Sequence, residues 1–279
     1  MPTYREEPAT VITSVQNIRV QRAKDLNRKK GRVLAGQFLL EGVRLVEEAL
    51  ASGIPLHEGF YSERLLNSER GQQLYRQLRT GGVDMVLVTD RVLQAISETE
   101  QCQGIVMIAD LPRYQWQEVC QKAGEKAAAL LLIIDGVQDP GNLGTMLRTA
   151  EAAGVQAVLL TAGTVDPFNP KVIRAAMGSV FRLPLASAPS SDELRQVLAD
   201  QGMAVFVADA HGERRYDQAD WTVPKMALVV GSEARGPEPL WLEGASEIVR
   251  IPLCAPVESL NAAIASALLL FEAAKQRRT

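Results

Sequence analysis

The stretch LLLIIDGVQDPGNLGTMLR, residues 130–148, contains an apolar run, a turn and the start of a helix. Leu130 to Ile134 is apolar at every position, as is typical of a strand buried on both faces of a parallel sheet. After Pro140 and Gly141, Asn142 stands where it can cap a helix, which we predict from Leu143 to Ala153. The stretch therefore predicts an α/β fold with a parallel sheet.

The same alternation continues towards the C-terminus. We predict strands at Val155–Leu160, Ala204–Ala208, Met226–Val230 and Ile248–Ile251, and helices at Lys171–Met177, Asp192–Asp200 and Leu260–Lys275. Strand-sized apolar runs that alternate with helices favour a mostly parallel sheet covered on both faces.

The first 110 residues or so predict a smaller α/β unit. It would hold a basic helix over Ser14–Arg28 and strands at Phe38–Leu40, Ile54–Tyr61, Val83–Val88 and Ile105–Ile108. The polar segment 112–127 then favours a linker, with one helical stretch. The expected domains are residues 1–111 and 128–279, joined by residues 112–127.

Charge is distributed unevenly along the chain. The net charge is −3, so the whole chain does not resemble a basic nucleic-acid binder. One segment is strongly basic, and its cations are Arg19, Arg22, Lys24, Arg28, Lys29, Lys30 and Arg32. Such a cluster is either an RNA-binding surface that contacts phosphates or a solvated helix face, and the sequence leaves both open.

Several classes of site are disfavoured by composition. Cys102, Cys120 and Cys254 form no C-x-x-C pair, so we predict reduced, packed thiols and no metal site. The two histidines, His57 and His211, are expected to be structural. No apolar run reaches the roughly 18 residues of a membrane span. These features predict a cytoplasmic protein with no metal and no membrane partner.

Three loops that follow predicted strands carry the candidate chemistry. They are residues 135–148, residues 229–237 and residues 251–261. Ligands of open parallel sheets bind beyond the carboxyl ends of the strands. Each loop alone also fits an ordinary capped helix or turn. The first loop matches neither G-x-G-x-x-G nor a phosphate-binding P-loop, which argues against a dinucleotide or nucleoside triphosphate enzyme.

The motifs in these loops resemble those of the SpoU (TrmH-type) RNA 2′-O-ribose methyltransferases of the SPOUT superfamily. The N-x(5)-R motif of that family matches Asn142 and Arg148, and its G-x-E-x-x-G motif matches Gly231, Glu233 and Gly236. The third motif matches Ile251, Pro252, Ser259, Leu260 and Asn261. Residues 37–48 and 97–106 resemble the L30e-like substrate-binding domain that often precedes the catalytic domain.

The resemblance implies a parallel-sheet catalytic domain with a deep trefoil knot, S-adenosylmethionine as methyl donor, structured RNA as substrate and a homodimer with its active site at the interface. The implied catalytic residues are Asn142, Arg148, Glu233, Ser259 and Asn261. The implied donor-binding residues are Leu160, Thr161, Ala162, Gly163, Val230, Gly231, Gly236, Ile251, Pro252, Leu260 and Asn261. The dimer surface would be the Ala- and Leu-rich face of the last helix.

Two questions stay open at this stage. Proposals for the family make Arg148 the base, but an arginine is almost never deprotonated, so it can instead hold a phosphate while Glu233 or a water accepts the proton. The two-domain layout is most similar to enzymes that act on large-subunit ribosomal RNA. Transfer RNA, base methylation and a non-catalytic RNA-binding protein are the alternatives.

Overall fold

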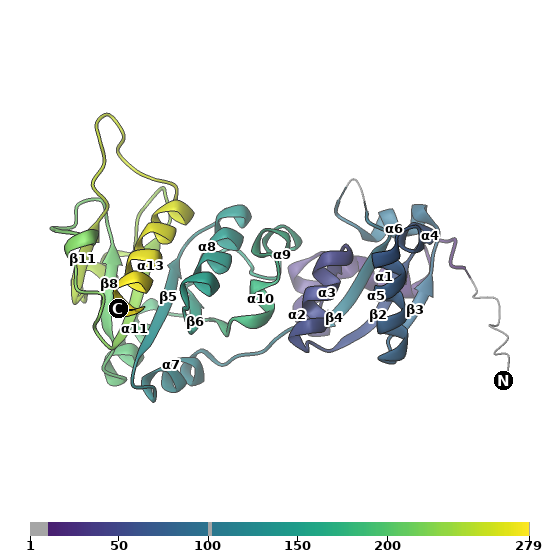
Figure 1. Cartoon of the computed structure of the whole chain (residues 1–279), viewed down its shortest axis with the longest axis horizontal. Helices are drawn as coiled ribbons and strands as arrows, with labels where there is room; N and C mark the ends of the chain where they lie inside the picture. Colours follow the sequence, from purple (N-terminus) through teal and green to yellow (C-terminus); the bar gives the residue numbers. More distant parts are fainter. Residues whose placement is uncertain (1–10, 100–101, 279) are drawn as a thin grey trace. The chain divides into compact units, whose positions relative to one another are not determined.

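The structure is a computed structural model that describes residues 11–99 and 102–278. The chain forms two compact units, whose elements are labelled in Figure 1. The first unit comprises the residues up to Pro112 together with residues 168–170. The second comprises Arg113–Pro167 and the chain from Lys171 onward.

The first unit is built on a four-stranded mixed sheet. Its order is β1-β4-β2-β3, in which β4 is antiparallel to β1 and β2, and β2 is parallel to β3. The strands are β1 (Gln37–Glu41), β2 (Leu56–Tyr61), β3 (Asp84–Leu87) and β4 (Ile105–Asp110). The helices are α1 (Ile18–Asp25), α2 (Lys29–Ala35), α3 (Val43–Ser52), α4 (Glu63–Leu66), α5 (Glu69–Thr80) and α6 (Asp90–Ile96). The smaller α/β unit predicted from the sequence is confirmed.

The basic helix predicted over Ser14–Arg28 is two helices in the structure. The Asn17 side chain accepts a hydrogen bond from the backbone N–H of Arg19, 2.9 Å away, and so caps α1. A tight turn follows α1, and hydrogen bonds from the buried side chain of Arg32 stabilise this turn. Its Nη1 donates to the carbonyl oxygens of Leu26 at 2.9 Å and Asn27 at 2.8 Å. Charge patterning alone does not show such a turn.

The second unit is built on a seven-stranded sheet in which all neighbouring strands are parallel. Its order is β7-β6-β5-β10-β8-β11-β9. The strands are β5 (Ala129–Asp135), β6 (Ala157–Leu160), β7 (Leu185–Ser187), β8 (Ala204–Ala208), β9 (Arg214–Arg215), β10 (Lys225–Gly231) and β11 (Glu247–Arg250). Every residue of β5 is buried, as its apolar run predicts. The short strands β7 and β9 were not predicted.

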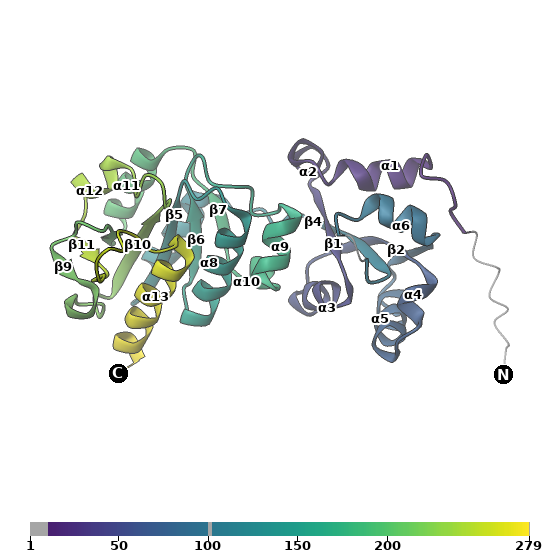
Figure 2. The same cartoon turned by 90° about the horizontal axis from the view of Figure 1, so that it is seen from above.

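Helices cover both faces of this sheet. On one face α8 (Pro140–Ala153) and α13 (Ala262–Arg278) lie side by side (Figures 1 and 2). The other face carries α7 (Trp116–Gly124), α11 (Ser191–Asp200) and α12 (Pro239–Glu243) over a shared apolar core. The remaining helices are α9 (Pro170–Ala176), α10 (Ser179–Arg182) and the 3₁₀ turn η1 (Tyr216–Gln218). The predicted parallel α/β architecture is confirmed.

The segment 112–127, expected to be a linker, contains α7. Trp116, Val119 and Cys120 of this helix are buried in the core of the second unit, against the apolar side chains of α11 and the sheet. The polar residues that favoured a linker are the solvent-facing positions of an amphipathic helix.

The strand order decides which loops meet. Strands β5 and β8 both pair with β10, so the loops that follow these three strands leave the sheet beside one another. Strand β11 pairs with β8, which brings the segment after Arg250 to the same edge.

Candidate active site

A cluster of two amides and one carboxylate joins the three candidate loops. Glu233 Oε1 accepts hydrogen bonds from Asn142 Nδ2, from Asn261 Nδ2 at 3.1 Å and from the backbone N–H of Ala262 at 3.1 Å. Asn261 Nδ2 also lies 2.9 Å from Asn142 Oδ1, to which it donates. Residues 91 and 119 positions apart in the chain thus bind one another directly. We call Asn142, Glu233 and Asn261 the amide–carboxylate cluster.

Helix capping explains how the two asparagines reach Glu233. The sequence placed Asn142 at the cap of α8, and this was wrong. The cap is Asp139, whose Oδ1 accepts from the N–H of Asn142 at 2.8 Å, and Pro140 begins the helix. The side chain of Asn142 is therefore free to point at Glu233. Asn261 does cap α13, because its Oδ1 accepts from the N–H groups of Ala263 at 3.0 Å and Ile264 at 3.2 Å.

The Gly231–Gly236 loop is closed too tightly for larger residues. The N–H of Gly236 donates to the carbonyl of Ser232 at 2.9 Å, and Gly236 has a φ of +66°. A Cβ on Gly231 would lie 2.1 Å from the carbonyl carbon of Gly236 and 2.1 Å from the nitrogen of Pro237. The two glycines of the motif are therefore needed for the backbone to fold back on itself and present Glu233.

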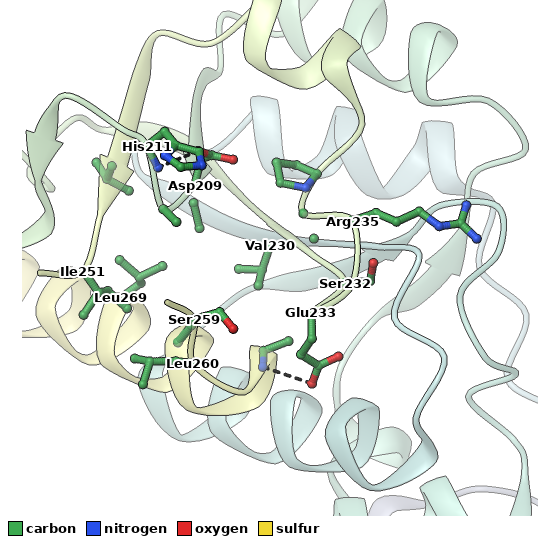
Figure 3. A pocket seen from close by; sticks show the side chains of 18 of the residues that line it. Asp209, His211, Val230, Ser232, Glu233, Arg235, Ile251, Ser259, Leu260 and Leu269 are labelled. Atoms are coloured by element: carbon green, nitrogen blue, oxygen red, sulfur yellow. Dashed lines mark hydrogen bonds between the residues drawn. The ribbon is translucent and has the colours of Figure 1, made fainter. Parts of the chain in front are cut away.

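A cavity of about 330 Å³ lies beside the amide–carboxylate cluster (Figure 3). Its apolar wall contains Val230, Val249, Ile251, Leu260 and Leu269. Polar groups line the rest, and Glu233 and Ser259 lie on the side of α13 while Asp209 and His211 lie at the far end in Figure 3. The size and the mixed lining are typical of a site for a small organic ligand. We call it the first cavity.

The predicted donor-binding residues divide into two groups. Val230, Gly231, Gly236, Ile251 and Leu260 line the first cavity. The other predicted residues do not line it, and these are Leu160, Thr161, Ala162, Gly163, Pro252 and Asn261. Leu160 ends β6 and the next three residues follow it. Strand β6 is separated from β10 by β5, so the strand order keeps these four residues away from this cavity.

Thr161 has a structural partner instead. Its Oγ1 donates to Asp135 Oδ1 at 2.5 Å, and both residues are buried. The second oxygen of Asp135 accepts from the N–H of Glu238 at 2.7 Å. This buried carboxylate therefore ties the end of β6 to the loop that follows β10.

The sequence reasoning missed the loop after β8. Ala208, Asp209, Ala210 and His211 all line the first cavity. The N–H of His211 donates to Asp209 Oδ1 at 2.7 Å. Strand β8 was predicted correctly, so the rule that ligands bind beyond carboxyl ends was available. The sequence does not give the spatial order of the strands, in which β8, and not β6, lies on the first-cavity side of β10.

Arg148 is exposed and lines neither the first cavity nor the second cavity described below. It lies on α8 six residues after Asn142, and no hydrogen bond joins its side chain to the amide–carboxylate cluster within the described residues. Ser259 lines the first cavity on the segment that leads into α13.

A second cavity, of about 480 Å³, lies on the other side of the Ser232–Pro237 loop. Its lining includes Glu233 and Arg235, which also line the first cavity. Ala162 and Gly163, expected at the donor site, line the second cavity instead.

The basic segment of the first unit is partly used within the protein. Arg19 bonds to Glu58 and Asp84, and Arg22 donates to Gln37 Oε1 at 2.7 Å. Arg32 is 3% exposed, which removes it from any RNA-binding surface. Lys24 is half-buried, while Arg28, Lys29 and Lys30 are exposed in consecutive positions.

Within residues 11–99 and 102–278, no helix combines the length and hydropathy that crossing a membrane requires. The same residues hold no group of three or more His, Cys, Asp or Glu side chains placed to bind a metal ion.

Comparison with known proteins gives a consistent assignment. Residues 129–271 match the SpoU rRNA Methylase family, and residues 17–107 match the MRM3-like substrate binding domain. The chain is 37% identical over 265 residues to the 23S rRNA (guanosine(2553)-2′-O)-methyltransferase RlmP of Bacillus subtilis, which covers 93% of this chain and 97% of that protein.

Two further matches extend over nearly the whole chain. The 23S rRNA (uridine(2479)-2′-O)-methyltransferase of Streptomyces viridochromogenes is 29% identical over 280 residues, which cover 98% of this chain and 94% of that one. The crystal structure of an AdoMet-bound rRNA methyltransferase from Sinorhizobium meliloti has a TM-score of 0.85 and 29% identity, and covers 96% of this chain and 98% of that one. The resemblance found in the three motifs is confirmed, and the chain belongs to the SpoU rRNA methylase family.

Proposed function

We propose that this S-adenosylmethionine-dependent RNA 2′-O-methyltransferase modifies a ribose in large-subunit ribosomal RNA. The observation that carries the proposal is the amide–carboxylate cluster, which joins one residue from each family motif beside a ligand-sized cavity. The two relatives described above are named for methylation of 23S rRNA, which supports the choice of RNA.

The first cavity fits S-adenosylmethionine. Its apolar wall of Val230, Ile251 and Leu260 suits the adenine ring. A Cβ at Gly231 would collide with Gly236 and Pro237, which also line the cavity. When bound, S-adenosylmethionine supplies an electrophilic methyl group on a sulfonium. Asp209 and His211 add hydrogen-bonding groups for the polar parts of the donor.

The chain's own residues position the acceptor ribose. Glu233 fixes the two asparagine amides, and Ser259 at the first cavity offers a hydroxyl close to the same edge. Arg148, permanently charged and exposed, holds a phosphate next to the target ribose. Correct placement of the hydroxyl against the donor methyl supplies much of the catalytic effect.

The first unit binds the RNA. The exposed Arg28, Lys29 and Lys30 form the core of the surface that contacts phosphates, with Lys24 beside them in sequence. Structured RNA is recognised mostly through shape and backbone, which suits such a surface. In this proposal residues 1–111 bind RNA and residues 128–279 catalyse, with α7 belonging to the catalytic part.

The family membership supports three further proposals. The segment between β11 and α13 lines the first cavity together with the Gly231–Gly236 loop, and we place the trefoil knot at these two segments. The exposed apolar residues Ile264, Leu268 and Phe271 of α13 form the homodimer surface, with exposed fractions of 52%, 39% and 48%. The cytoplasm is the compartment that suits an enzyme acting on ribosomal RNA.

The test is to map 2′-O-methyl groups in total RNA from cells with and without the protein. We expect one site in large-subunit ribosomal RNA to lose its methyl group when the protein is absent, and to regain it when purified protein and S-adenosylmethionine are added. A site confined to transfer RNA would refute the ribosomal assignment. The absence of any altered site, together with no methyl transfer in vitro, would favour the non-catalytic RNA-binding alternative.

A further inference from the structure

The second cavity adjoins the first cavity through one loop. The Ser232–Pro237 segment lines both, and Glu233 of the amide–carboxylate cluster faces both. A nucleotide whose ribose lies at Glu233, with the methyl donor in the first cavity, therefore has the second cavity within reach of its base. At about 480 Å³ this cavity is large enough for a nucleobase.

The charged side chains that line the second cavity indicate which part of a nucleotide can bind there. Its lining contains the carboxylates Asp135, Asp139, Glu233 and Glu238, and one cation, Arg235. A phosphate would meet net negative charge there, so its entry is unfavourable. A group with N–H donors is attracted instead. The small side chains of Gly136, Ala162 and Gly163 leave room for an aromatic ring.

Most of these polar groups already have partners. Of the lining side chains without a partner among the described residues, Ser232 and Arg235 also line the first cavity, and only Gln138 and Glu238 line the second cavity alone. Asp135 binds Thr161 and the N–H of Glu238, Asp139 caps α8, and Glu233 holds the two asparagines. Among residues 11–99 and 102–278, the side chains of Gln138 and Glu238 have no hydrogen bond or ion pair. Both are exposed and line the second cavity. The Glu238 backbone is fixed by Asp135, which is 4% exposed, so its carboxylate projects from an anchored position.

We propose that the second cavity binds the base of the target nucleotide and selects guanine, and that Glu238 and Gln138 are the residues that hydrogen bond to this base, here called the reading residues.

Guanine has two adjacent N–H donors on its Watson–Crick edge, N1–H and the N2 amino group, and a carboxylate accepts both at once. The O6 atom beside them accepts from a glutamine amide. Uracil has one imino donor between two carbonyl acceptors, so a carboxylate meets repulsion on either side of it. Adenine and cytosine each offer one amino group beside an unprotonated ring nitrogen. This selection rests on the proposed function, and it requires that the base is turned out of the RNA so that it enters the second cavity.

The first experiment identifies the modified nucleoside. Unmodified total RNA is incubated with the full-length protein and S-adenosylmethionine that carries a tritiated methyl group, and is then digested to nucleosides. We expect the label in 2′-O-methylguanosine. Label in 2′-O-methyluridine, -cytidine or -adenosine would overturn the inference while leaving the proposed function intact. No label in any nucleoside would contradict the proposed function itself, and the inference with it.

The second experiment assigns the reading residues. Glu238→Gln and Gln138→Ala are compared with Glu243→Gln, which alters an exposed carboxylate at the other end of α12, outside both cavities. We expect Glu238→Gln to lower kcat/KM for RNA by about tenfold or more, the size of effect that one hydrogen-bonded base contact gives. The Kd for S-adenosylmethionine should be unchanged in all three variants, which also shows that they are folded.

A synthetic RNA that contains the labelled site shows whether Glu238 contacts the base or only supports the structure of the enzyme. Inosine lacks the N2 amino group of guanosine, so an RNA with inosine at the target position should be a poorer substrate for the wild-type enzyme. Glu238→Gln should show a much smaller difference between guanosine and inosine, because the group that accepts from N2 is already impaired. Equal guanosine preference in the wild type and in both variants would overturn the assignment of the second cavity.

Discussion

Each residue of the amide–carboxylate cluster hydrogen bonds to the other two through polar side-chain atoms, and Asn261 has a second structural role. Its Oδ1 caps α13 while its Nδ2 binds Asn142 and Glu233, so helix start and site geometry are fixed by one side chain. Arg148 differs, because it is exposed and lies outside the first cavity. At the scale of single residues, donor binding and acceptor handling are therefore separable.

Arg148→Ala should strongly reduce turnover without loss of donor binding. Removal of a charged contact to the reacting nucleotide is expected to lower kcat/KM by about 10²–10³-fold. The Kd for S-adenosylmethionine should stay within about twofold, as measured by calorimetry. Arg182→Ala, which removes a cation engaged with Glu151 outside both cavities, serves as the control. Loss of donor binding in Arg148→Ala would contradict the role given to this residue.

The position of α8 depends on a close approach at Gly144. A Cβ at this position would lie 2.4 Å from the Cβ of Ala175 and 2.8 Å from the carbonyl oxygen of Val172, both on α9. Helix α8 carries Asn142 and Arg148, so a displaced α8 would disturb the site as well as the packing.

Gly144→Ala is therefore expected to destabilise the protein, although alanine favours a helix. Overpacking of this kind typically costs about 1–3 kcal/mol. Thermal unfolding should shift downward by several degrees, while Thr145→Ala at the neighbouring exposed position should unfold close to the wild-type temperature. A Gly144→Ala variant as stable as the wild type would show that α8 and α9 adjust freely.

The start of α2 has a charge pattern that helix stability does not explain. Arg28 is the N-cap of this helix, and Lys29 and Lys30 follow it. Cations near a helix N-terminus are unfavourable because they face the positive end of the helix dipole. In the proposed function, the RNA backbone is the anionic partner that offsets this cost.

Replacement of Arg28, Lys29 and Lys30 by glutamine should weaken RNA binding and flatten its salt dependence. Three lost phosphate contacts would reduce the slope of log K against log salt by about 2–3. The matched control, Arg76→Gln with Arg79→Gln, removes two exposed cations of α5 in the same unit. Filter binding over a range of salt concentrations gives both slopes. An unchanged slope in the triple variant would remove this surface from the proposal.

At the scale of the whole molecule, α13 presents an apolar stripe that the described chain leaves uncovered. Ile264, Leu268 and Phe271 recur at helical spacing on its exposed side, while the opposite side packs on α8. A stripe of this kind is typical of an interface between subunits.

Leu268→Glu combined with Phe271→Glu should convert a dimer into a monomer. Burial of two new charges in an apolar interface is strongly unfavourable. Light scattering should give twice the 30.4 kDa of one chain for the wild type and about one chain mass for the variant. Leu50→Glu, an exposed apolar position on α3, is the control and should keep the wild-type mass. A monomeric wild type would refute the homodimer.

The sequence by itself determined the α/β class, most of the strands and the composition of the central cluster. The apolar run in β5 can be satisfied only by burial. The resemblance of three motifs to those of the SpoU family indicated that Asn142, Glu233 and Asn261 belong to one site. The cap of α8 was available from the sequence, because Asp139 followed by Pro140 is a usual start of a helix. The burial of Arg32 was not predictable, because it depends on which backbone carbonyls the side chain reaches after folding.

Only the tertiary structure decided which loops share a cavity. The sequence gives strands in chain order, whereas the pocket depends on their spatial order, and β8 rather than β6 lies beside β10 on the first-cavity side. The loop after β8 therefore contributes Asp209 and His211, while Thr161 after β6 is bound to buried Asp135. The physical reason is that parallel strands join through long crossovers, so neighbours in the sheet need not be neighbours in the chain.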